Sequence, residues 1–163
     1  MNTGSKKILI TELSTLEVPE ALNLAWKVFQ EYESPDYSKE GTEEFRKCLH
    51  DNAYLDGITY FGAYDEEKLV GLVGIRLKEG HICFFFVDGA YHRRGIGRSL
   101  FEFVKSRVYV RPITLNSSPY GLPFYNALGF KAVSAEQTVN GIGFTPMVFD
   151  EKTKMNDNLE GKL

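Results

Sequence analysis

The stretch that most constrains the fold is the apolar run His81–Val87 (HICFFFV), which is followed by a polar loop and a pair of glycines. A run this continuous is typical of a strand covered on both faces in the middle of a sheet. Gly95 and Gly97 then open a segment whose apolar residues recur with helical spacing. The sequence therefore predicts a central strand, a turn and a helix, in that order.

The start of that helix has the features of a phosphate-binding site. Backbone N–H groups at a helix start lack intrahelical partners, and the helix dipole adds partial positive charge there. Glycine lets a ligand approach the backbone closely, and Arg93, Arg94 and Arg98 add charge around the loop. The alternative is an ordinary strand–helix turn with solvated arginines. A P-loop pattern is absent and the dinucleotide pattern GxGxxG is incomplete, so both nucleotide-binding folds are excluded.

Short strands and helices alternate along the rest of the chain. We expect strands over residues 8–13, 60–64, 69–77, 112–116, 130–133 and 144–149. A first helix should follow the capping box Ser14–Glu17 and end near Ser34, before Pro35. A second helix should contain Phe45 on its apolar face, and a short helix should cover residues 123–128. This order predicts one mixed α/β domain over residues 1–163, with a core at 8–149 and a polar tail at 150–163.

Composition excludes several classes of function. The formal net charge is −3, whereas a dedicated nucleic-acid binder usually shows a basic excess, so we expect no nucleic-acid partner. No apolar run approaches the ~18 residues of a membrane span, and no signal-peptide core follows the N-terminal lysines, so a cytoplasmic location is expected. Cys48 and Cys83 form no CxxC pair, which predicts buried thiols without a disulfide, metal or catalytic role.

Two motifs resemble those of the GNAT superfamily of N-acetyltransferases. The loop His92–Gly97 (HRRGIG) is similar to the family's Q/R-x-x-G-x-G/A motif, with His92 at the position of Gln or Arg. The stretch Ser118–Phe130 (SPYGLPFYNALGF) is similar to the family element N-x-x-A-x-x-x-Y-x-x-x-G-F, in which Tyr125 is matched and Ser118 stands for Asn. The order of elements over residues 8–149 also resembles that of the family.

The resemblance implies an α/β (α+β) fold with a mostly antiparallel central sheet, splayed central strands and flanking helices. It also implies acetyl-coenzyme A as the acetyl donor, bound at the glycine loop and along the exposed edge of the central strand. The residues implied to bind it are Phe86, Val87, Asp88, His92, Arg93, Arg94, Gly95, Ile96, Gly97, Arg98, Asn116, Ser118 and Tyr125.

The same resemblance implies acetyl transfer to a primary amine by direct attack on the thioester, without an acyl-enzyme. Tyr125 matches the family tyrosine that protonates the departing thiolate. His81 is our candidate general base, because histidine titrates near neutral pH, and an ordered water chain is the alternative. A backbone N–H near Val87 is expected to stabilise the carbonyl oxygen as it gains charge.

The acceptor pocket is expected between the first two helices. Its candidate residues are Trp26, Phe29, Glu33, Asp36 and Tyr37, of which the two carboxylates suit a cationic amine. A homodimer is possible through the apolar segment 143–149. Two other functions stay open: a non-catalytic acyl-coenzyme A sensor, which would bind the cofactor but release no thiol, and a protein-interaction module that binds no cofactor.

Overall fold

The computed structural model describes residues 7–151, so the expected tail lies almost wholly outside the described residues. An eight-stranded sheet has helices on both sides, with the strand order β1-β2-β3-β4-β5-β8-β6 and β7 paired to β8. Only β4 and β5 run parallel, which confirms the mixed, mostly antiparallel fold. The strands are β1 (Ile8–Glu12), β2 (Thr59–Asp65), β3 (Lys68–Arg76), β4 (His81–Val87), β5 (Ile113–Ser117), β6 (Lys131–Ala132), β7 (Gln137–Val139) and β8 (Ile142–Phe149).

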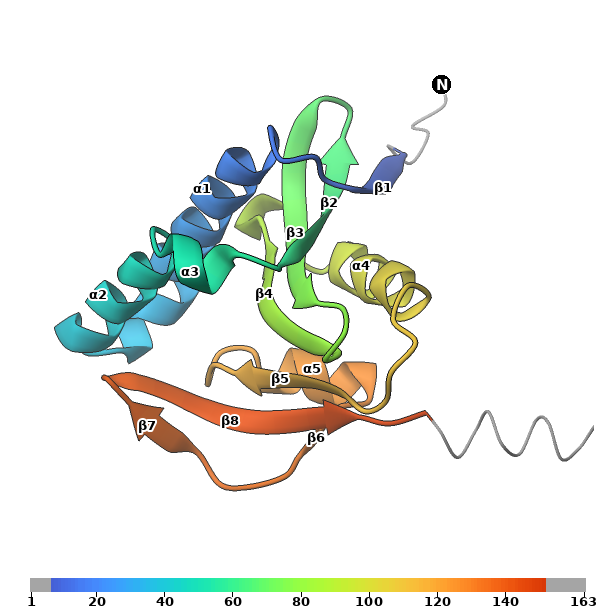
Figure 1. The fold of residues 1–163 in the computed structure, drawn as a ribbon. Coiled ribbons are helices and arrows are strands. Elements are labelled where there is room, and N and C mark those ends of the chain that lie inside the picture. Colours follow the sequence, from blue (N-terminus) through green and yellow to red (C-terminus); the bar gives the residue numbers. More distant parts are fainter. Residues whose placement is uncertain (1–6, 152–163) are drawn as a thin grey trace, which may run out of the picture.

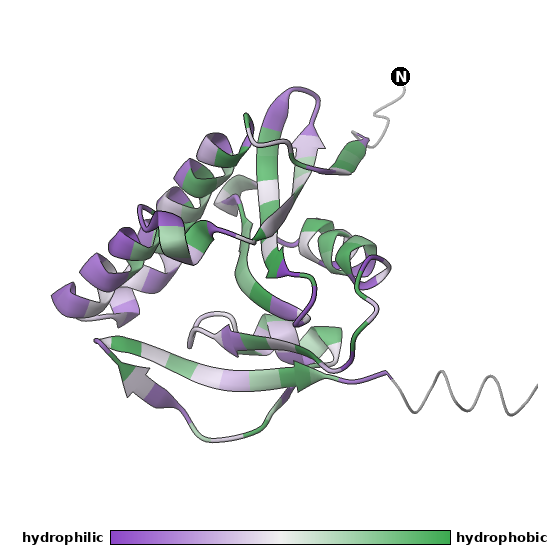
Figure 2. Ribbon diagram, viewed as in Figure 1, coloured by the Kyte–Doolittle hydropathy of each residue, from purple (hydrophilic) through white to green (hydrophobic). Residues whose placement is uncertain are grey.

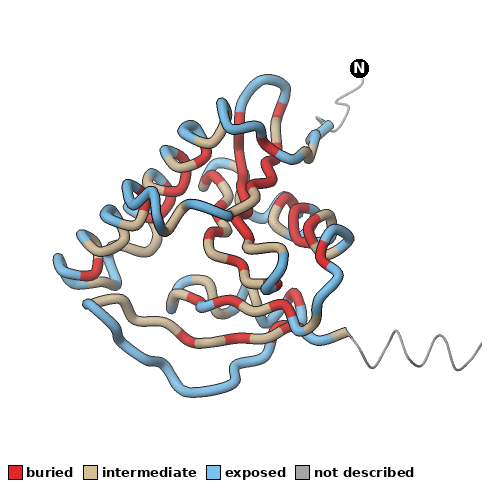
Figure 3. Tube along the Cα trace, viewed as in Figure 1, coloured by how far each residue is buried: buried red, intermediate tan, exposed pale blue. Residues whose placement is uncertain are grey.

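The helices divide between the two sides of the sheet (Figure 1). They are α1 (Val18–Val28), α2 (Lys39–Cys48), the short α3 (Asn52–Leu55), α4 (Ile96–Lys105) and α5 (Leu122–Leu128). One hydrophobic core joins α1 and α2 to the sheet, and the other lies between the sheet, α4 and α5. Figure 2 shows apolar residues concentrated in β3, β4 and α4. In Figure 3, β3 is mostly buried, while buried residues alternate with less buried ones in β4 and α4.

The first helix does not end as expected. The Glu17 carboxylate accepts a hydrogen bond from the Ser14 N–H at 3.0 Å, as in a capping box, but the helix begins only at Val18. It continues beyond Val28 as a π-helical turn over Phe29–Glu33 and then as a 3₁₀ turn over Ser34–Asp36. Pro35 therefore does not stop the helical path at Ser34, because proline fits the first positions of a helical turn, where no N–H is needed.

A β-bulge explains why the central strands splay apart. Ile82 pairs with Ile75 and Phe84 with Gly74, which leaves Cys83 as an extra residue in β4. Such a residue bends its strand. Pairing between β4 and β5 is limited to His81 with Thr114 and Ile82 with Leu115, so it stops where the bulge begins.

Because of the bulge, side chains two residues apart in β4 pack on opposite sides of the sheet. Ile82 belongs to the core beneath α4, whereas Phe84 and Phe86 belong to the core beneath α1 and α2. The apolar run is therefore covered on both sides, as the sequence predicts. Beyond Ile82, the edge of β4 that faces β5 has no partner strand among residues 7–151.

The C-terminal region contains a hairpin that the sequence pattern did not indicate. β7 pairs with the first residues of β8, while β6 pairs with Val148 and Met147 near its end. The opposite edge of β8 pairs with β5. Residues 145–149 of β8 thus pair with β5 on one edge, and β7 and β6 pair with the other edge. A homodimer through residues 143–149 stays a prediction. No helix among residues 7–151 is long and apolar enough to cross a membrane.

Candidate active site

Two cavities open on the gap between the splayed strands. The first has a volume of about 590 Å³ and extends to the glycine loop, and the second, of about 410 Å³, extends between α2 and the β7–β8 hairpin. Both volumes are typical of small-molecule sites. The residues common to both linings are Glu33, Phe85, Phe86 and Tyr125. These four residues therefore mark the place where molecules bound in the two cavities would meet.

The glycine loop presents an open helix start to the first cavity. Gly95 precedes α4 in the left-handed conformation, with φ at 79°, and a Cβ built there meets nothing within 4 Å. Gly97, in contrast, leaves no room for a side chain, since a Cβ there would lie 2.7 Å from the Phe124 ring. The free N–H groups of the first turn, together with Arg93 and Arg98 in the lining, fit an anion such as a pyrophosphate.

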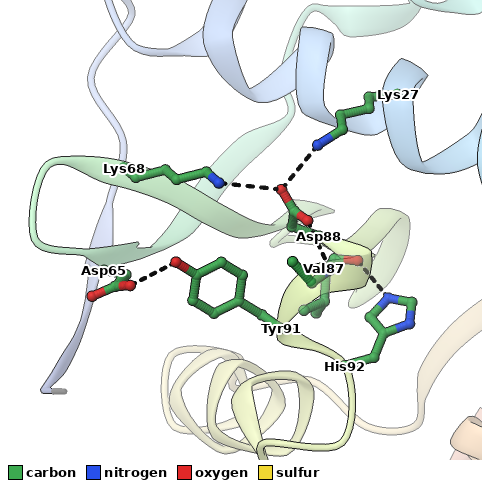
Figure 4. A network of polar contacts seen from close by, with 8 residues as sticks. Lys27, Asp65, Lys68, Val87, Asp88, Tyr91 and His92 are labelled. Atoms are coloured by element: carbon green, nitrogen blue, oxygen red, sulfur yellow. Dashed lines mark hydrogen bonds and ion pairs between the residues drawn. The ribbon is translucent and has the colours of Figure 1, made fainter.

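Hydrogen bonds and ion pairs fix the segment that joins β4 to the glycine loop (Figure 4). His92 Nε2 donates to the Val87 carbonyl oxygen at 2.7 Å. The Tyr91 hydroxyl donates to Asp65 Oδ2 at 2.6 Å, which ties the loop to the β2–β3 hairpin. The loop is therefore attached both to the end of β4, through His92, and to β2, through Tyr91.

Asp88 is the buried anchor of this segment. Its side chain accepts from the Ala90 N–H at 3.0 Å and lies 3.2 Å from Lys27 Nζ and 3.9 Å from Lys68 Nζ. Burial alone would raise the pKa of this carboxyl, but the Ala90 N–H and the two ammonium groups outweigh burial and lower the pKa. The Asp88 side chain is thus an ionised carboxylate that stabilises the start of the loop through its contacts with the Ala90 N–H, Lys27 and Lys68.

The open edge of β4 offers backbone groups to the gap. The Asp88 N–H donates to the Val70 carbonyl oxygen on β3 at 2.8 Å. Because backbone groups alternate along a strand, those of Phe86 also point to β3, while those of Phe85 and Val87 point into the gap. His92 occupies the Val87 carbonyl. The Val87 N–H and both backbone groups of Phe85 remain for a ligand.

The π-helical turn places consecutive side chains in different cavities. Phe29, at its start, lines the second cavity, Tyr32 lines the first, and Glu33 lines both. Tyr32 packs against the His92 ring at 4.7 Å and the Tyr120 ring at 5.2 Å between centroids. Single π turns within helices are rare and frequently lie at functional sites.

Glu33 has an unusual environment for a carboxylate. Burial raises its pKa to about 7, although a hydrogen bond with the Ser118 side chain acts in the opposite direction. No Lys or Arg among residues 7–151 forms an ion pair with it. A carboxyl group with a pKa near neutrality can both accept and release a proton under ordinary conditions.

Tyr125 comes from α5 and faces the same junction. Its ring packs against Phe85 and Phe130, each at 5.8 Å. Burial, and then the charge of Glu33, raise the pKa of this phenol well above its usual range. Tyr125 therefore keeps its proton at neutral pH and can only donate it or share it in a hydrogen bond.

Nine of the 21 described residues that line the second cavity are Phe or Tyr. Phe45, on α2, stacks on Phe29 at 4.0 Å and meets Phe84 and Phe86 edge-on at 6.2 and 5.8 Å. His81 lines its far end, where its Nδ1 lies 2.7 Å from Thr114 Oγ1 and burial lowers the pKa of the imidazole. The far end is thus the closed base of the gap, where β4 and β5 still pair.

The structure brings together most of the residues expected to bind the acetyl donor. Those lining the first cavity are Phe86, Val87, His92, Arg93, Gly95, Ile96, Gly97, Arg98 and Tyr125. Asp88 lies beneath the loop, and the Arg94 guanidinium lies over the Tyr91 ring at 5.1 Å, so neither lines this cavity. Asn116 and Ser118 line the second cavity instead.

The residues expected to bind the acceptor divide in the same way. Phe29, Glu33 and Tyr37 line the second cavity, and Trp26 stacks behind Phe29 at 5.9 Å. Asp36 is exposed and lies outside the lining. Residues that the sequence did not indicate complete both sites: Tyr32, Phe85, Tyr91, Tyr120 and Phe124 in the first cavity, and Glu44, Phe45, Tyr54, Asn140 and Phe144 in the second.

Both cysteines are half-buried and line the second cavity, whereas full burial was expected. Burial raises the pKa of the Cys48 and Cys83 thiols. A thiol with a raised pKa is a poor nucleophile at neutral pH, because only the thiolate attacks.

Comparison with known proteins shows the family of the chain. The family model described as "Acetyltransferase (GNAT) domain" matches residues 33–151. The chain belongs to the GNAT acetyltransferase family. It is accordingly an acyltransferase, with acetyl-coenzyme A as its co-substrate. No curated protein sequence matches the chain.

Solved GNAT structures have the same fold at low sequence identity. A GCN5-related N-acetyltransferase from Rhodopseudomonas palustris is 18% identical, with a TM-score of 0.75 over 92% of this chain and 99% of that one. The PaiA N-acetyltransferase from Thermoplasma acidophilum, in complex with coenzyme A, is 18% identical, with a TM-score of 0.68 over 88% and 99%. The ribosomal-protein-S18-alanine N-acetyltransferase from Escherichia coli is 18% identical, with a TM-score of 0.58 over 88% and 94%.

Proposed function

We propose that this GNAT protein transfers an acetyl group to a primary amine, which attacks the thioester directly. The observation that carries the proposal is the meeting of the two cavities at Glu33, Phe85, Phe86 and Tyr125. A donor in the first cavity and an amine in the second would come together there without an enzyme nucleophile between them. The half-buried thiols, whose pKa is raised, offer no alternative nucleophile.

The first cavity fits the donor. The N–H groups at the start of α4, with Arg93 and Arg98, would hold the pyrophosphate. The free backbone groups of Phe85 and Val87 would pair with the amide-bearing arm as with an added strand. Acetyl-coenzyme A supplies the thioester carbon. The Val87 N–H, which points into the gap, is positioned to donate to the carbonyl oxygen as that oxygen gains charge.

Glu33 is our proposed general base. The C–N bond forms as the C–S bond breaks, and the amine must lose a proton, for which the nearest carboxylate at the junction is Glu33. Its pKa of about 7 leaves a substantial fraction ionised at neutral pH and still makes it basic enough to work. His81 and an ordered water chain stay as alternatives. His81, however, lies four residues along β4 from Phe85, or roughly 13 Å at strand rise.

Tyr125 is our proposed hydrogen-bond donor to the departing thiolate, in place of the full proton transfer that the resemblance implies. Its phenol stays protonated at neutral pH because burial raises its pKa. A phenol with a pKa this high acts mainly through a hydrogen bond to the sulfur, and the thiolate then takes its proton from water. Replacing Tyr125 with Phe should therefore lower kcat more than it changes binding.

The first experiment is calorimetric titration with acetyl-coenzyme A, for the wild type beside the double variant Gly95→Asp/Gly97→Asp. Tight binding that the double variant loses would support the donor site. Thiol release with a panel of amines, by the wild type, Glu33→Gln, His81→Gln and Tyr125→Phe, then tests catalysis. Binding without thiol release would favour the sensor function, and an absence of binding would leave only the protein-interaction module.

A further inference from the structure

The second cavity has a composition that restricts its ligand. Its lining includes the aromatic residues Phe29, Tyr37, Phe45, Tyr54, Phe84, Phe85, Phe86, Tyr125 and Phe144. It also includes two carboxylates, Glu33 and Glu44, but no Lys or Arg from the described part of the chain. Building on the proposed function, we infer that the acceptor is a small primary amine on an aromatic body that carries no carboxylate.

Charge provides the first part of the argument. Glu33 and Glu44 form no ion pair with any Lys or Arg among residues 7–151. An ammonium group entering the cavity therefore finds both a carboxylate and aromatic faces, which attract cations. An acceptor carboxylate would instead be removed from water beside two acidic groups. Arg76 lies beside Cys83 and over the Tyr54 ring but does not line the cavity. Its guanidinium already donates to the Tyr54 and Asp56 carbonyl oxygens. Amino acids are thus poor candidates, although nearly all of them carry a primary amine.

The shape of the walls provides the second part. Phe45 is held by ring contacts with Phe29, Phe84 and Phe86, so the wall beside α2 is a set of fixed aromatic surfaces. A flat apolar body gains both buried area and favourable ring geometry against such a wall. An alkyl amine of the same length gains buried area alone.

Contacts between α2 and the β7–β8 hairpin limit the size of the ligand. The Tyr37 hydroxyl donates to the Gly143 carbonyl oxygen at 3.1 Å. A Cβ on Gly41 would lie 2.2 Å from the Gly141 carbonyl oxygen, so the hairpin turn lies directly on the first turn of α2. These contacts join the walls on either side of the cavity. Together with its volume of about 410 Å³, this favours a small molecule over a polypeptide terminus.

Trp26 provides a direct readout of binding. It is the only tryptophan of the chain, and it stacks on Phe29 at 5.9 Å and on Phe45 at 6.4 Å, both of which line the cavity. Its fluorescence should therefore change when an acceptor binds in the second cavity, even when no acetyl transfer takes place. This separates acceptor binding from catalysis.

The test titrates the full chain, saturated with coenzyme A, with 2-phenylethylamine, phenylalanine and n-hexylamine. The first two differ only in the carboxylate. We expect 2-phenylethylamine to bind at least about tenfold more tightly than phenylalanine, and n-hexylamine, an alkyl amine of similar length, to bind more weakly than 2-phenylethylamine. The values of kcat/KM for thiol release from acetyl-coenzyme A should follow the same order. Equal or tighter binding of phenylalanine, or no fluorescence response to 2-phenylethylamine, would overturn the inference.

Two variants locate the effect. Glu44→Gln should reduce the discrimination against phenylalanine several-fold. Glu43→Gln, a neighbouring carboxylate that pairs with Arg46 on the exposed face of α2, should leave it unchanged. If some other amine is acetylated while 2-phenylethylamine is not, the proposed function stands and the acceptor class is wrong. If acetyl-coenzyme A itself does not bind, the proposed function fails.

Discussion

His92 Nε2 donates a hydrogen bond to the carbonyl oxygen of Val87 at 2.7 Å. Because a carbonyl can only accept, the proton must be on Nε2. The contact links the first residue of the glycine motif to the last residue of β4, and it occupies one of the backbone groups that face the gap. His92 therefore sets the position of the loop relative to the strand edge, at a place where the related motif has Gln or Arg.

Replacing His92 with Ala should weaken acetyl-coenzyme A binding by about three- to tenfold, because a hydrogen bond worth about 1 kcal/mol is lost. His92→Gln, which keeps an N–H donor, should recover most of that loss. Calorimetry gives the affinity, and the acceptor KM serves as the control that should not move. Equal affinity of the wild type and the Ala variant would show that the hydrogen bond does not position the loop.

The rate of acetyl transfer should rise with pH through about 7, the pKa to which burial raises Glu33. The ionised carboxylate is the basic form, so activity is lost as the pH falls through that value. Glu33→Gln should lower kcat by about 10²–10⁴-fold and abolish this limb of the profile. A profile that keeps the same limb in Glu33→Gln and loses it in His81→Gln would assign the base to His81.

The same carboxyl should reduce the stability of the fold above neutral pH. Its folded pKa of about 7 lies above the unfolded value of 4.5, so the folded state binds the proton more tightly. Stability due to this group is present below pH 4.5 and falls as the pH rises towards 7. Glu33→Gln should therefore gain roughly 1–3 kcal/mol over the wild type at pH 8, and almost nothing at pH 4. Urea unfolding at the two pH values measures the difference.

Gly41→Ala should destabilise the protein, although alanine normally favours a helix by about 1 kcal/mol over glycine. The added methyl would lie 2.2 Å from the Gly141 carbonyl oxygen, so the hairpin would have to move away from α2. We expect a lower midpoint of urea unfolding and a raised acceptor KM, with acetyl-coenzyme A affinity preserved. Thr42→Ala, at the next position of the helix, is the matched control. A stabilised Gly41→Ala variant would contradict the close contact.

Asp88→Asn should cost about 1–2 kcal/mol of stability at pH 7, because a buried carboxylate loses its charge-assisted hydrogen bonds. The folded pKa of Asp88 is lowered from 3.8, so its contribution is present above that pH and is lost as the pH falls further. The difference between wild type and variant should therefore narrow in acid. Lys27→Ala, which removes only one exposed partner, should cost less than about 1 kcal/mol.

The sequence predicts those parts of the fold whose residues act locally. The run His81–Val87 has the composition of a covered strand, and Gly95 has the conformation that a helix start after a tight turn requires. The segments expected around residues 60–64 and 69–77 are β2 and β3, with nearly the same boundaries. The sequence indicates both Tyr125 and Glu33 as site residues, but it indicates Glu33 only as a residue that binds the acceptor.

What the sequence does not predict depends on contacts between distant segments. The π turn at Phe29–Glu33 has no separate apolar pattern, and only this turn brings Glu33 into both cavities. The extra residue Cys83 is visible only once β4 is paired with β3. Phe45 and Phe144 lie in different halves of the chain, so their presence in one lining requires the folded sheet.

The bulge at Cys83 leaves a row of unpaired backbone groups inside the sheet, where most proteins complete the ladder. Exposed strand edges are otherwise found at the margins of sheets, where they invite unwanted pairing. The arm of the acetyl donor would occupy this edge as a temporary strand. The Phe85 and Val87 amide protons, which face the gap, should accordingly exchange faster in the free protein than those of Phe86 and Asp88, which face β3, and should slow down when coenzyme A binds. The protein thus depends on its own substrate to complete its sheet.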